Sequence, residues 1–289
     1  MSIRHLAVIG LGLIGGSFAR ALRAAGEVER IVGFDPDAVQ REQATALGVV
    51  DQVFDDAAAA VRDADLVVLA VPVLHTAEAL RSCVGALKAG AIVSDVGSTK
   101  QSVLRDVAAV CGGLPPWFVA AHPIAGTEKS GVANSFAELF RNHRVILTPH
   151  AGQDPVARAT VASLWRAVGA RVVEMDARQH DAVFAATSHL PHVLAYSFVD
   201  MLDRLDHSDD IFSNAGGGFR DFTRIASSSP QMWHDIMRAN ADAVGSLLDR
   251  QIDELQQIRR MMRDSRRDEL KAVFERARTA RERYLTQIE

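Results

Sequence analysis

Short apolar segments alternate with helical segments over the first 175 residues, and this alternation limits the possible folds more than any other feature of the chain. We predict strands at HLAVIG, RIVGFD, DLVVLAVP, AIVSDVG, WFVAAHP, RVILTP and RVVEM. Strands that are apolar at nearly every position are buried on both faces of a sheet, and strands separated by helices pair in parallel. Residues 1–175 are therefore expected to form a doubly wound α/β domain.

The strand signal stops near Asp176, and residues 176–289 have the pattern of an all-α domain. The segment SSSPQMW opens a long predicted helix, with Ser229 as its N-cap and Pro230 at its first position. Apolar residues recur at near-helical spacing in the last two segments: Val244, Leu248, Leu255, Ile258 and Met262, then Leu270, Val273, Phe274, Ala277 and Tyr284. Amphipathic helices with wide apolar stripes pack together, so we expect a homodimer formed through this domain.

The composition argues against several classes of function. Of the 289 residues 48% are hydrophobic and 24% charged, and the net charge is −4, so no nucleic-acid partner is expected. Cys83 and Cys111 form neither a metal-ligand spacing nor a disulfide framework, which fits a reducing compartment. The sequence predicts no signal peptide and no transmembrane span. We expect a soluble, cytoplasmic protein without a membrane partner.

A glycine-rich segment, AVIGLGLIGGSF, follows the first predicted strand and opens a helix. Gly10, Gly12 and Gly15 have the GxGxxG spacing of dinucleotide-binding domains of the Rossmann type. The first glycine permits a tight turn, the second lets the backbone approach a pyrophosphate, and the third allows close helix packing. The alternative is a glycine-rich turn that binds nothing.

Asp35 ends the second predicted strand, near the roughly 20-residue offset at which a carboxylate binds the adenosine ribose. Because a carboxylate there repels a 2′-phosphate, we predict NAD rather than NADP as the cofactor. Asp35 is equally suited to cap a helix that begins at Pro36. The predicted cofactor contacts are Gly10, Gly12, Leu13, Ile14, Gly15, Asp35, Val71 and Pro72.

His122 follows the apolar run Phe118 to Ala121, at the carboxyl end of a predicted strand where ligands of α/β sheets bind. The preceding strand ends in VGSTK, which brings Ser98 toward the same edge. A histidine in this position is either a turn residue with structural hydrogen bonds or a catalyst. Ser98 likewise is either a site residue or the cap of the next helix.

Five segments occur in the order and type seen in one enzyme family: GLGLIGGS, DVGSTK, HPIAGTEKSG, SHLPH and GGGFRDFTRIASSSPQMW. In these segments the chain resembles the prephenate dehydrogenase family of tyrosine biosynthesis over nearly its whole length. The HPxxGTExSG block and the GGGFRDFTRIA block with its downstream tryptophan are the specific ones. The resemblance implies NAD-dependent oxidative decarboxylation of prephenate to 4-hydroxyphenylpyruvate, or of arogenate to tyrosine.

By the same resemblance His122 accepts the proton of the substrate's ring hydroxyl, so turnover is expected to fall as the pH drops through the histidine range. Ser98 and Thr127 are expected to hydrogen-bond His122, the substrate or the nicotinamide. Arg224 matches the family's carboxylate-binding arginine, whose guanidinium forms bidentate hydrogen bonds. A surface ion pair is its alternative role.

His189 and His192 lie three residues apart, with Pro191 expected to distort the local hydrogen bonding. We expect them to line the substrate cleft rather than bind metal, because no third ligand is evident. Asp221 is expected to orient its neighbours, including Arg224. The predicted substrate-binding residues are Arg224, His192, His189, Thr127, Asp221, Gly217 and Trp233, with His122 and Ser98 as the predicted catalytic pair and no metal.

Three questions stay open. SHLPH offers histidines and no carboxylate for an ammonium group, which favours prephenate over arogenate, although Glu128 and Asp221 are possible ammonium partners. A β-hydroxyacid dehydrogenase or pyrroline carboxylate reductase also joins a dinucleotide domain to helices, but Lys271 is the only lysine after residue 176 and lacks the matching motif. An NAD sensor without turnover would not need His122 together with Arg224. Because no regulatory domain is predicted, tyrosine inhibition is expected to act at or near the substrate site.

Overall fold

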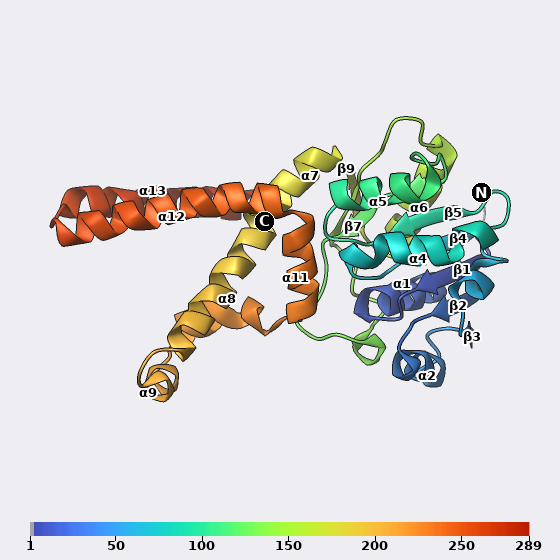
Figure 1. Cartoon of the computed structure of the whole chain (residues 1–289), viewed down its shortest axis with the longest axis horizontal. Coiled ribbons are helices and arrows are strands. Elements are labelled where there is room, and N and C mark those ends of the chain that lie inside the picture. The colour runs from blue at the N-terminus through green and yellow to red at the C-terminus, as the bar shows by residue number, and fades with distance from the viewer. Residues whose placement is uncertain (1–2, 289) are drawn as a thin grey trace. The chain divides into compact units, whose positions relative to one another are not determined.

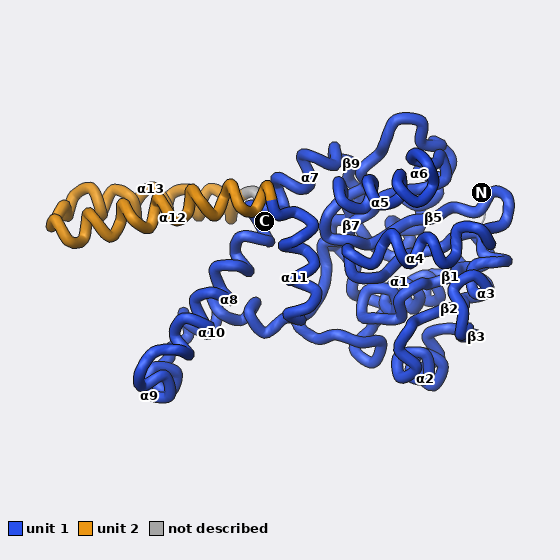
Figure 2. Tube along the Cα trace, in the orientation of Figure 1, with its two compact units in different colours: residues 1–241 blue, residues 242–289 orange. Residues whose placement is uncertain are grey.

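The computed structural model describes residues 3–288. The chain forms two compact units, Met1–Ala241 and Asp242–Glu289, drawn in different colours in Figure 2. The first unit holds both sheets and all the helices up to residue 239. It therefore includes the first part of the predicted all-α region, and the domain boundary between residues 175 and 176 remains a prediction.

The first unit is built on a six-stranded parallel sheet with the order β3-β2-β1-β4-β5-β6 (Figure 1). Its strands are β1 His5–Ile9, β2 Arg30–Phe34, β3 Gln52–Val53, β4 Leu66–Leu69, β5 Ile92–Asp95 and β6 Phe118–Val119. The strand order reverses between β1 and β4, which is the point where doubly wound sheets bind their ligands. The predicted fold is confirmed, and only the two-residue β3 has no counterpart among the predicted strands.

The apolar strands bury both of their faces, as predicted, in two separate cores. In β1, Leu6 and Val8 belong to one core while Ala7 and Ile9 belong to the other, because successive side chains point to opposite faces. Helices α1 Leu13–Ala24 and α6 Pro155–Ala167 cover the first core. Helices α3 Ala57–Val61, α4 Thr76–Cys83 and α5 Gln101–Cys111 cover the second, and α2 Ala38–Ala46 follows β2.

The predicted strand WFVAAHP is in fact two strands that belong to different sheets. Phe118–Val119 is β6 of the large sheet, whereas β7 Ala121–Pro123 lies in a three-stranded sheet with β8 Arg144–Leu147 and β9 Arg171–Glu174. Strand β7 runs antiparallel to β8, so the expectation of purely parallel pairing is wrong here. The reason is local: the Asp95 carboxylate accepts the Ala121 N–H at 3.1 Å, where a backbone carbonyl of β5 would continue the large sheet.

The rest of the first unit is helical after β9. Its elements are α7 Ala177–Phe184, a π-helical turn Ala185–His189, α8 Leu190–Asp203, α9 Ser208–Ser213, α10 Gly217–Thr223 and α11 Pro230–Ala239. The Ser229 hydroxyl accepts the Met232 N–H at 3.4 Å, so this residue caps α11 with Pro230 in the first turn, as predicted. The long helix expected from SSSPQMW is wrong, because α11 ends before Asn240.

The second unit is a pair of long helices, α12 Ala241–Arg263 and α13 Arg267–Ile288, joined by a turn at residues 264–266. Ser265 adopts a left-handed conformation with φ of 55°, which reverses the chain. Several residues of the predicted apolar stripes are exposed in the single chain: Leu255, Met262, Phe274 and Tyr284. None of the helices within residues 3–288 is long and apolar enough to cross a bilayer.

Candidate active site

The glycine-rich turn joins β1 to α1 at the point where the strand order reverses. Gly10 has φ of +100°, and a Cβ on it would lie 2.4 Å from the Ala70 carbonyl oxygen. A Cβ on Gly15 would lie 2.3 Å from the Gly10 carbonyl oxygen, so both positions require glycine. Gly12, in contrast, is the N-cap of α1 and has no atom near its missing Cβ. The helix N-terminus is thus open to a phosphate group, which fits a dinucleotide.

Asp35 lies directly beside this turn. Its carboxylate accepts the N–H of Leu11 at 2.7 Å and that of Asp37 at 2.9 Å, and burial raises the pKa of the group. The helix-cap alternative for Asp35 is wrong, since Asp37 caps α2 by accepting the Val39 N–H. Ala70, the residue after β4, packs against the glycine turn. Val71 and Pro72 come directly after it in the chain.

His122 lies in the middle of β7 rather than beyond a strand end, with 9% of its surface exposed. Its Nδ1 is 2.8 Å from Nε2 of His180, and its ring meets Phe184 edge-on at 4.9 Å between centroids. Burial, followed by the charges of His180 and Lys100, lowers the pKa of His122 well below 6.5. The ring is therefore a neutral proton acceptor at pH 7.

A buried ion pair anchors the strand that carries His122. The Lys100 ammonium donates to Asp95 Oδ2 at 2.5 Å and to the Ala121 carbonyl at 2.7 Å, and both side chains are almost fully buried. The Asp95 carboxylate also accepts the N–H groups of Gly97 and Ala121. These contacts join the end of β5, the start of α5 and β7 around one pair of charges.

Asp181 of α7 caps helix α5 from outside that helix. Its two carboxylate oxygens accept the N–H groups of Lys100 at 2.7 Å and Gln101 at 2.9 Å. The alternative role of Ser98 as the cap of this helix is wrong, because α5 begins at Gln101 and has no side-chain cap of its own. Ser98 is half-buried, and the hydrogen-bond partner of His122 within the described residues is His180 rather than Ser98 or Thr127.

The segment with the two other histidines combines a π-helical turn with α8. Pro191 stands in the first turn of α8, and the distortion predicted for this segment takes the form of the π-turn before it. His189 is buried beside the Asn240 amide at 3.1 Å, and burial lowers its pKa to about 4. The His192 ring stacks on Trp233 with 3.5 Å between centroids. No cluster of three metal-ligand side chains occurs among residues 3–288.

Arg224 lies on the surface next to the loop that follows β7. Its Nη1 is 3.5 Å from the Glu128 carboxylate, and 62% of its side chain is exposed. Glu128 and Thr127 belong to a cavity of ≈ 340 Å³ whose other lining residues are Lys129, Asn134 and Phe136. Asp221 and Gly217 are exposed on α10, and in the described part of the chain Asp221 makes no ion pair with Arg224. The expected orienting contact is therefore replaced by Glu128.

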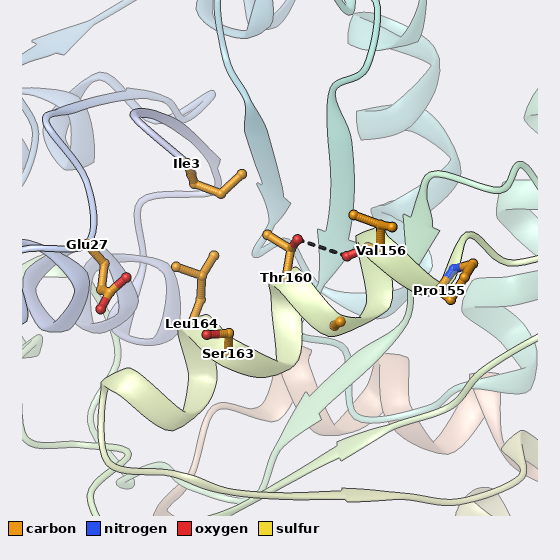
Figure 3. Close-up of a pocket in the computed structure, with 8 residues that line it drawn as sticks. Ile3, Glu27, Pro155, Val156, Thr160, Ser163 and Leu164 are labelled. Atoms are coloured by element: carbon orange, nitrogen blue, oxygen red, sulfur yellow. Dashed lines mark hydrogen bonds between the residues drawn. The ribbon is translucent and has the colours of Figure 1, made fainter. Parts of the chain in front are cut away.

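A second cavity, of ≈ 440 Å³, lies along α6 and is drawn in Figure 3. Its lining includes Ile3, Glu27, Pro155, Val156, Thr160, Ser163 and Leu164. Glu27 is the only charged side chain there, and Thr160 donates its hydroxyl to the Val156 carbonyl of its own helix. Glu27 has no second charged or histidine side chain beside it in this lining, whereas His122 lies in a buried cluster of titratable groups, so we place the site at His122.

His180, Asp181 and Asn240 are absent from the predicted site residues, although the structure gathers them around His122 and His189. A signal for two of them exists in the sequence, where His180 and Asp181 stand side by side just after the last strand. Asn240 has no such signal. A glycine turn at the reversal of the strand order together with a buried neutral histidine defines a nucleotide-dependent dehydrogenase.

Comparisons with known proteins agree with this class. Residues 18–174 match the prephenate dehydrogenase nucleotide-binding domain, and residues 176–276 match the prephenate dehydrogenase dimerization domain. The chain belongs to the prephenate dehydrogenase family, which confirms the resemblance of the five sequence motifs. A cyclohexadienyl dehydrogenase of Zymomonas mobilis is 41% identical over 281 residues, which cover 96% of this chain and 95% of that protein.

Two solved structures share the whole architecture. The prephenate dehydrogenase of A. aeolicus in complex with hydroxyphenyl propionate and NAD+ has a TM-score of 0.91 and 35% identity, covering 98% of this chain and 99% of that one. Synechocystis arogenate dehydrogenase has a TM-score of 0.79 and 26% identity, covering 97% and 99%. The relatives thus include enzymes named for different cyclohexadiene substrates.

Proposed function

We propose that this chain oxidises prephenate with NAD and releases 4-hydroxyphenylpyruvate, CO2 and NADH. The observation that carries the proposal is the buried neutral His122 on β7, a strand of the small sheet that Asp95 ties to the end of β5 in the nucleotide-binding sheet. The hydroxyl-bearing ring carbon loses a hydride, His122 takes up the hydroxyl proton, and loss of CO2 makes the ring aromatic. Bound NAD supplies the hydride acceptor.

The proposed cofactor site lies along the turn between β1 and α1. Gly12, Leu13, Ile14 and Gly15 offer backbone N–H groups to the pyrophosphate, and Asp35 accepts the ribose hydroxyls. Gly10, Val71 and Pro72 line the adjoining strand ends. The open space at Gly12 and the position of Asp35 beside Leu11 support this assignment.

The proposed substrate site uses cations and a stacked ring pair. Arg224 binds a substrate carboxylate bidentately, and the His192–Trp233 stack, with His189 behind it, forms a wall of the cleft. Ser98, Thr127, Asp221 and Gly217 are proposed to complete the contacts with substrate and nicotinamide.

Arogenate is the second candidate substrate, alone or together with prephenate. The relatives named cyclohexadienyl dehydrogenase and arogenate dehydrogenase support it, as does the Glu128 carboxylate next to Arg224, which could pair with an ammonium group. Prephenate is favoured because, within the described residues, His189 and His192 make their hydrogen bonds with the Asn240 amide and the Ser188 carbonyl and with no carboxylate.

We propose further that two copies associate through the region 176–289. The match to a dimerization domain and the exposed apolar residues of α12 and α13 support this assembly. The boundary between the nucleotide-binding and helical parts is kept at residues 175 and 176, next to the junction of the two family matches.

The test is an assay of NADH formation with purified protein, NAD and either prephenate or arogenate, run beside the His122→Asn variant. We expect NADH with prephenate and a loss of about 10² to 10⁴ in rate in the variant, the usual contribution of a general base. If only arogenate is turned over, arogenate takes the place of prephenate as the assigned substrate. Failure of both substrates, with NAD binding intact, would contradict the proposed function.

A further inference from the structure

His122, His180 and Asp181 form a hydrogen-bonded chain of three buried side chains. The proposed reaction assigns a role to His122 and none to His180 or Asp181. Nδ1 of His122 lies 2.8 Å from Nε2 of His180, and Nδ1 of His180 lies 2.8 Å from Oδ1 of Asp181. His180 and Asp181 are essentially inaccessible to solvent, so neither touches the substrate from the surface.

We propose that His180 and Asp181 are positioning residues that hold the His122 ring in the tautomer with a bare Nε2. The importance of this tautomer for the rate rests on the proposed function, whereas the tautomer itself follows from the two hydrogen bonds and from the ionised Asp181 at the end of the chain.

The direction of each hydrogen bond follows from the carboxylate. Although burial raises the pKa of Asp181, its hydrogen bonds from His180, Lys100 and Gln101 lower it below the usual value, so the group is ionised and only accepts. Nδ1 of His180 must then donate. In a neutral ring the other nitrogen, Nε2, accepts, and the donor that it meets is Nδ1 of His122. The lone pair of His122 is left on Nε2, the nitrogen that His180 does not occupy.

The position of the Asp181 carboxylate is itself fixed by the fold. Besides His180, it accepts the N–H groups of Lys100 and Gln101 at the start of α5. The Asn240 amide donates to the Asp181 carbonyl at 2.9 Å. The carboxylate thus cannot turn away from His180 without uncapping α5, and the start of a Rossmann helix determines the orientation of the base.

The charges around the pair keep both rings neutral. The Lys100 ammonium, itself paired with Asp95, faces them from the β5–α5 junction, and His189 faces His122 from the π-turn. Burial lowers the pKa of His180, with Lys100 acting in the same direction and Asp181 and Asp95 against it. A protonated His180 would instead donate to Nδ1 of His122, move the proton of that ring to Nε2, and remove the base.

The first experiment observes the tautomer directly, by nitrogen NMR of protein labelled with ¹⁵N-histidine, with the His122 signals assigned by their loss in His122→Asn. We expect a protonated Nδ1 and a bare Nε2 in the wild type at pH 7. A protonated Nε2 would overturn the inference. Because this readout does not depend on turnover, failure of the proposed function with both substrates leaves it interpretable.

The second experiment compares two substitutions of His180. In His180→Gln the side-chain oxygen can still accept from Nδ1 of His122, whereas His180→Phe keeps a ring of similar shape and offers no acceptor. We expect kcat to fall about 100-fold in the phenylalanine variant, within the range of a lost general base, with KM for NAD nearly unchanged and a substantial recovery in the glutamine variant. The His122 signals should move toward the Nε2-protonated form only in His180→Phe.

The matched control is His143→Phe, the same change at an exposed residue before β8. It should keep the wild-type kcat and the wild-type His122 signals. Thermal unfolding and NAD binding of His180→Phe report whether the variant is folded. A folded His180→Phe enzyme with wild-type kcat, or an equal loss in the phenylalanine and glutamine variants, would overturn the positioning role.

Discussion

The ionisation of single side chains depends here on where the fold places them. His122 and His189 are both buried, and desolvation lowers the pKa of each, to about 4 for His189. Lys100 lies close enough to His122 to act in the same direction. A histidine that would be half protonated near 6.5 in water is therefore kept as a base in this site.

The first prediction concerns pH. The decline of kcat/KM with acid should have its midpoint below 6.5, lower than the ordinary histidine range expected from sequence, because the folded pKa of His122 is depressed. In the window between that pKa and 6.5 the unfolded chain binds a proton that the folded chain does not, so the free energy of unfolding decreases as the pH falls. A pH-rate profile and urea titrations at several pH values test this. A midpoint at 6.5 or above would contradict it.

The second prediction concerns Arg224. Replacement by alanine should raise the KM for the substrate about 10- to 100-fold, as expected for one lost charged hydrogen-bonding group, with a smaller change in the KM for NAD. Steady-state kinetics of Arg224→Ala against Arg220→Ala, an exposed arginine on neighbouring α10, make the comparison. An unchanged substrate KM in the first variant would show that Arg224 is only a surface ion-pair partner of Glu128.

The third prediction concerns Asp35. Wild-type kcat/KM should favour NAD over NADP by about 100-fold or more, because a carboxylate beside a 2′-phosphate costs several kcal/mol. Asp35→Asn should narrow this ratio, whereas Asp37→Asn, at the exposed cap of α2, should leave it unchanged. Comparable efficiencies with the two cofactors in the wild type would refute the role of Asp35.

At the scale of elements, helix ends and strand ends carry most of the site. Helix α1 begins at the glycine turn, and α5 begins at the Asp181 carboxylate, which is supplied by another helix. Strand β7 is held to the large sheet by Asp95 and Lys100 instead of by a continued backbone ladder. These junctions bring α7 against the Rossmann part of the same compact unit.

The fourth prediction concerns the buried ion pair at one of these junctions. Lys100→Met should destabilise the fold by about 3–5 kcal/mol, since it leaves the Asp95 charge buried without its partner. Lys88→Met, which breaks a partly exposed pair with Asp65, should cost less than about 1 kcal/mol. The midpoints and slopes of urea unfolding curves measure both. If the two variants lose the same free energy of unfolding, burial does not strengthen the Lys100–Asp95 pair as predicted.

The pattern of elements could be predicted because it depends on local periodicity. The apolar runs, the glycine turn and the cap at Ser229 are local signals, and the structure contains all three. The split at Ala120 and the capping of α5 by Asp181 depend on contacts between residues far apart in sequence. No window of residues around Ser98 or Phe118 contains that information. For this reason the single strand expected at WFVAAHP and the alternative role of Ser98 as a helix cap are both wrong.

At the scale of the whole molecule, the second unit exposes several large apolar side chains. Leu255, Met262 and Phe274 are each more than half exposed in the single chain. An apolar face of this kind is costly in water and is stabilised when a partner covers it. The family match over residues 176–276 points to a second copy of the chain as that partner.

The fifth prediction concerns this association. Light scattering at micromolar concentration should give twice the 31.3 kDa of one chain, and the double variant Leu255→Glu with Phe274→Glu should shift the mass toward the monomer. Lys271→Glu, an exposed change on the same helix as Phe274, should leave the mass unchanged. A wild-type mass equal to that of one chain would contradict the proposed homodimer.

Because the run Phe118–Pro123 is divided between two sheets, the number of residues between β6 and β7 determines where His122 lies. Only Ala120 separates the strand that lies in the cofactor-binding sheet from the strand that carries His122. Because side chains alternate along a strand, one inserted residue there would turn the base to the opposite face, away from His180. An insertion between Val119 and Ala121 should therefore remove the contact between His122 and His180, whatever the inserted residue is. The position of His122 depends on the number of residues before it, and repacking of neighbouring side chains cannot compensate for a change in that number.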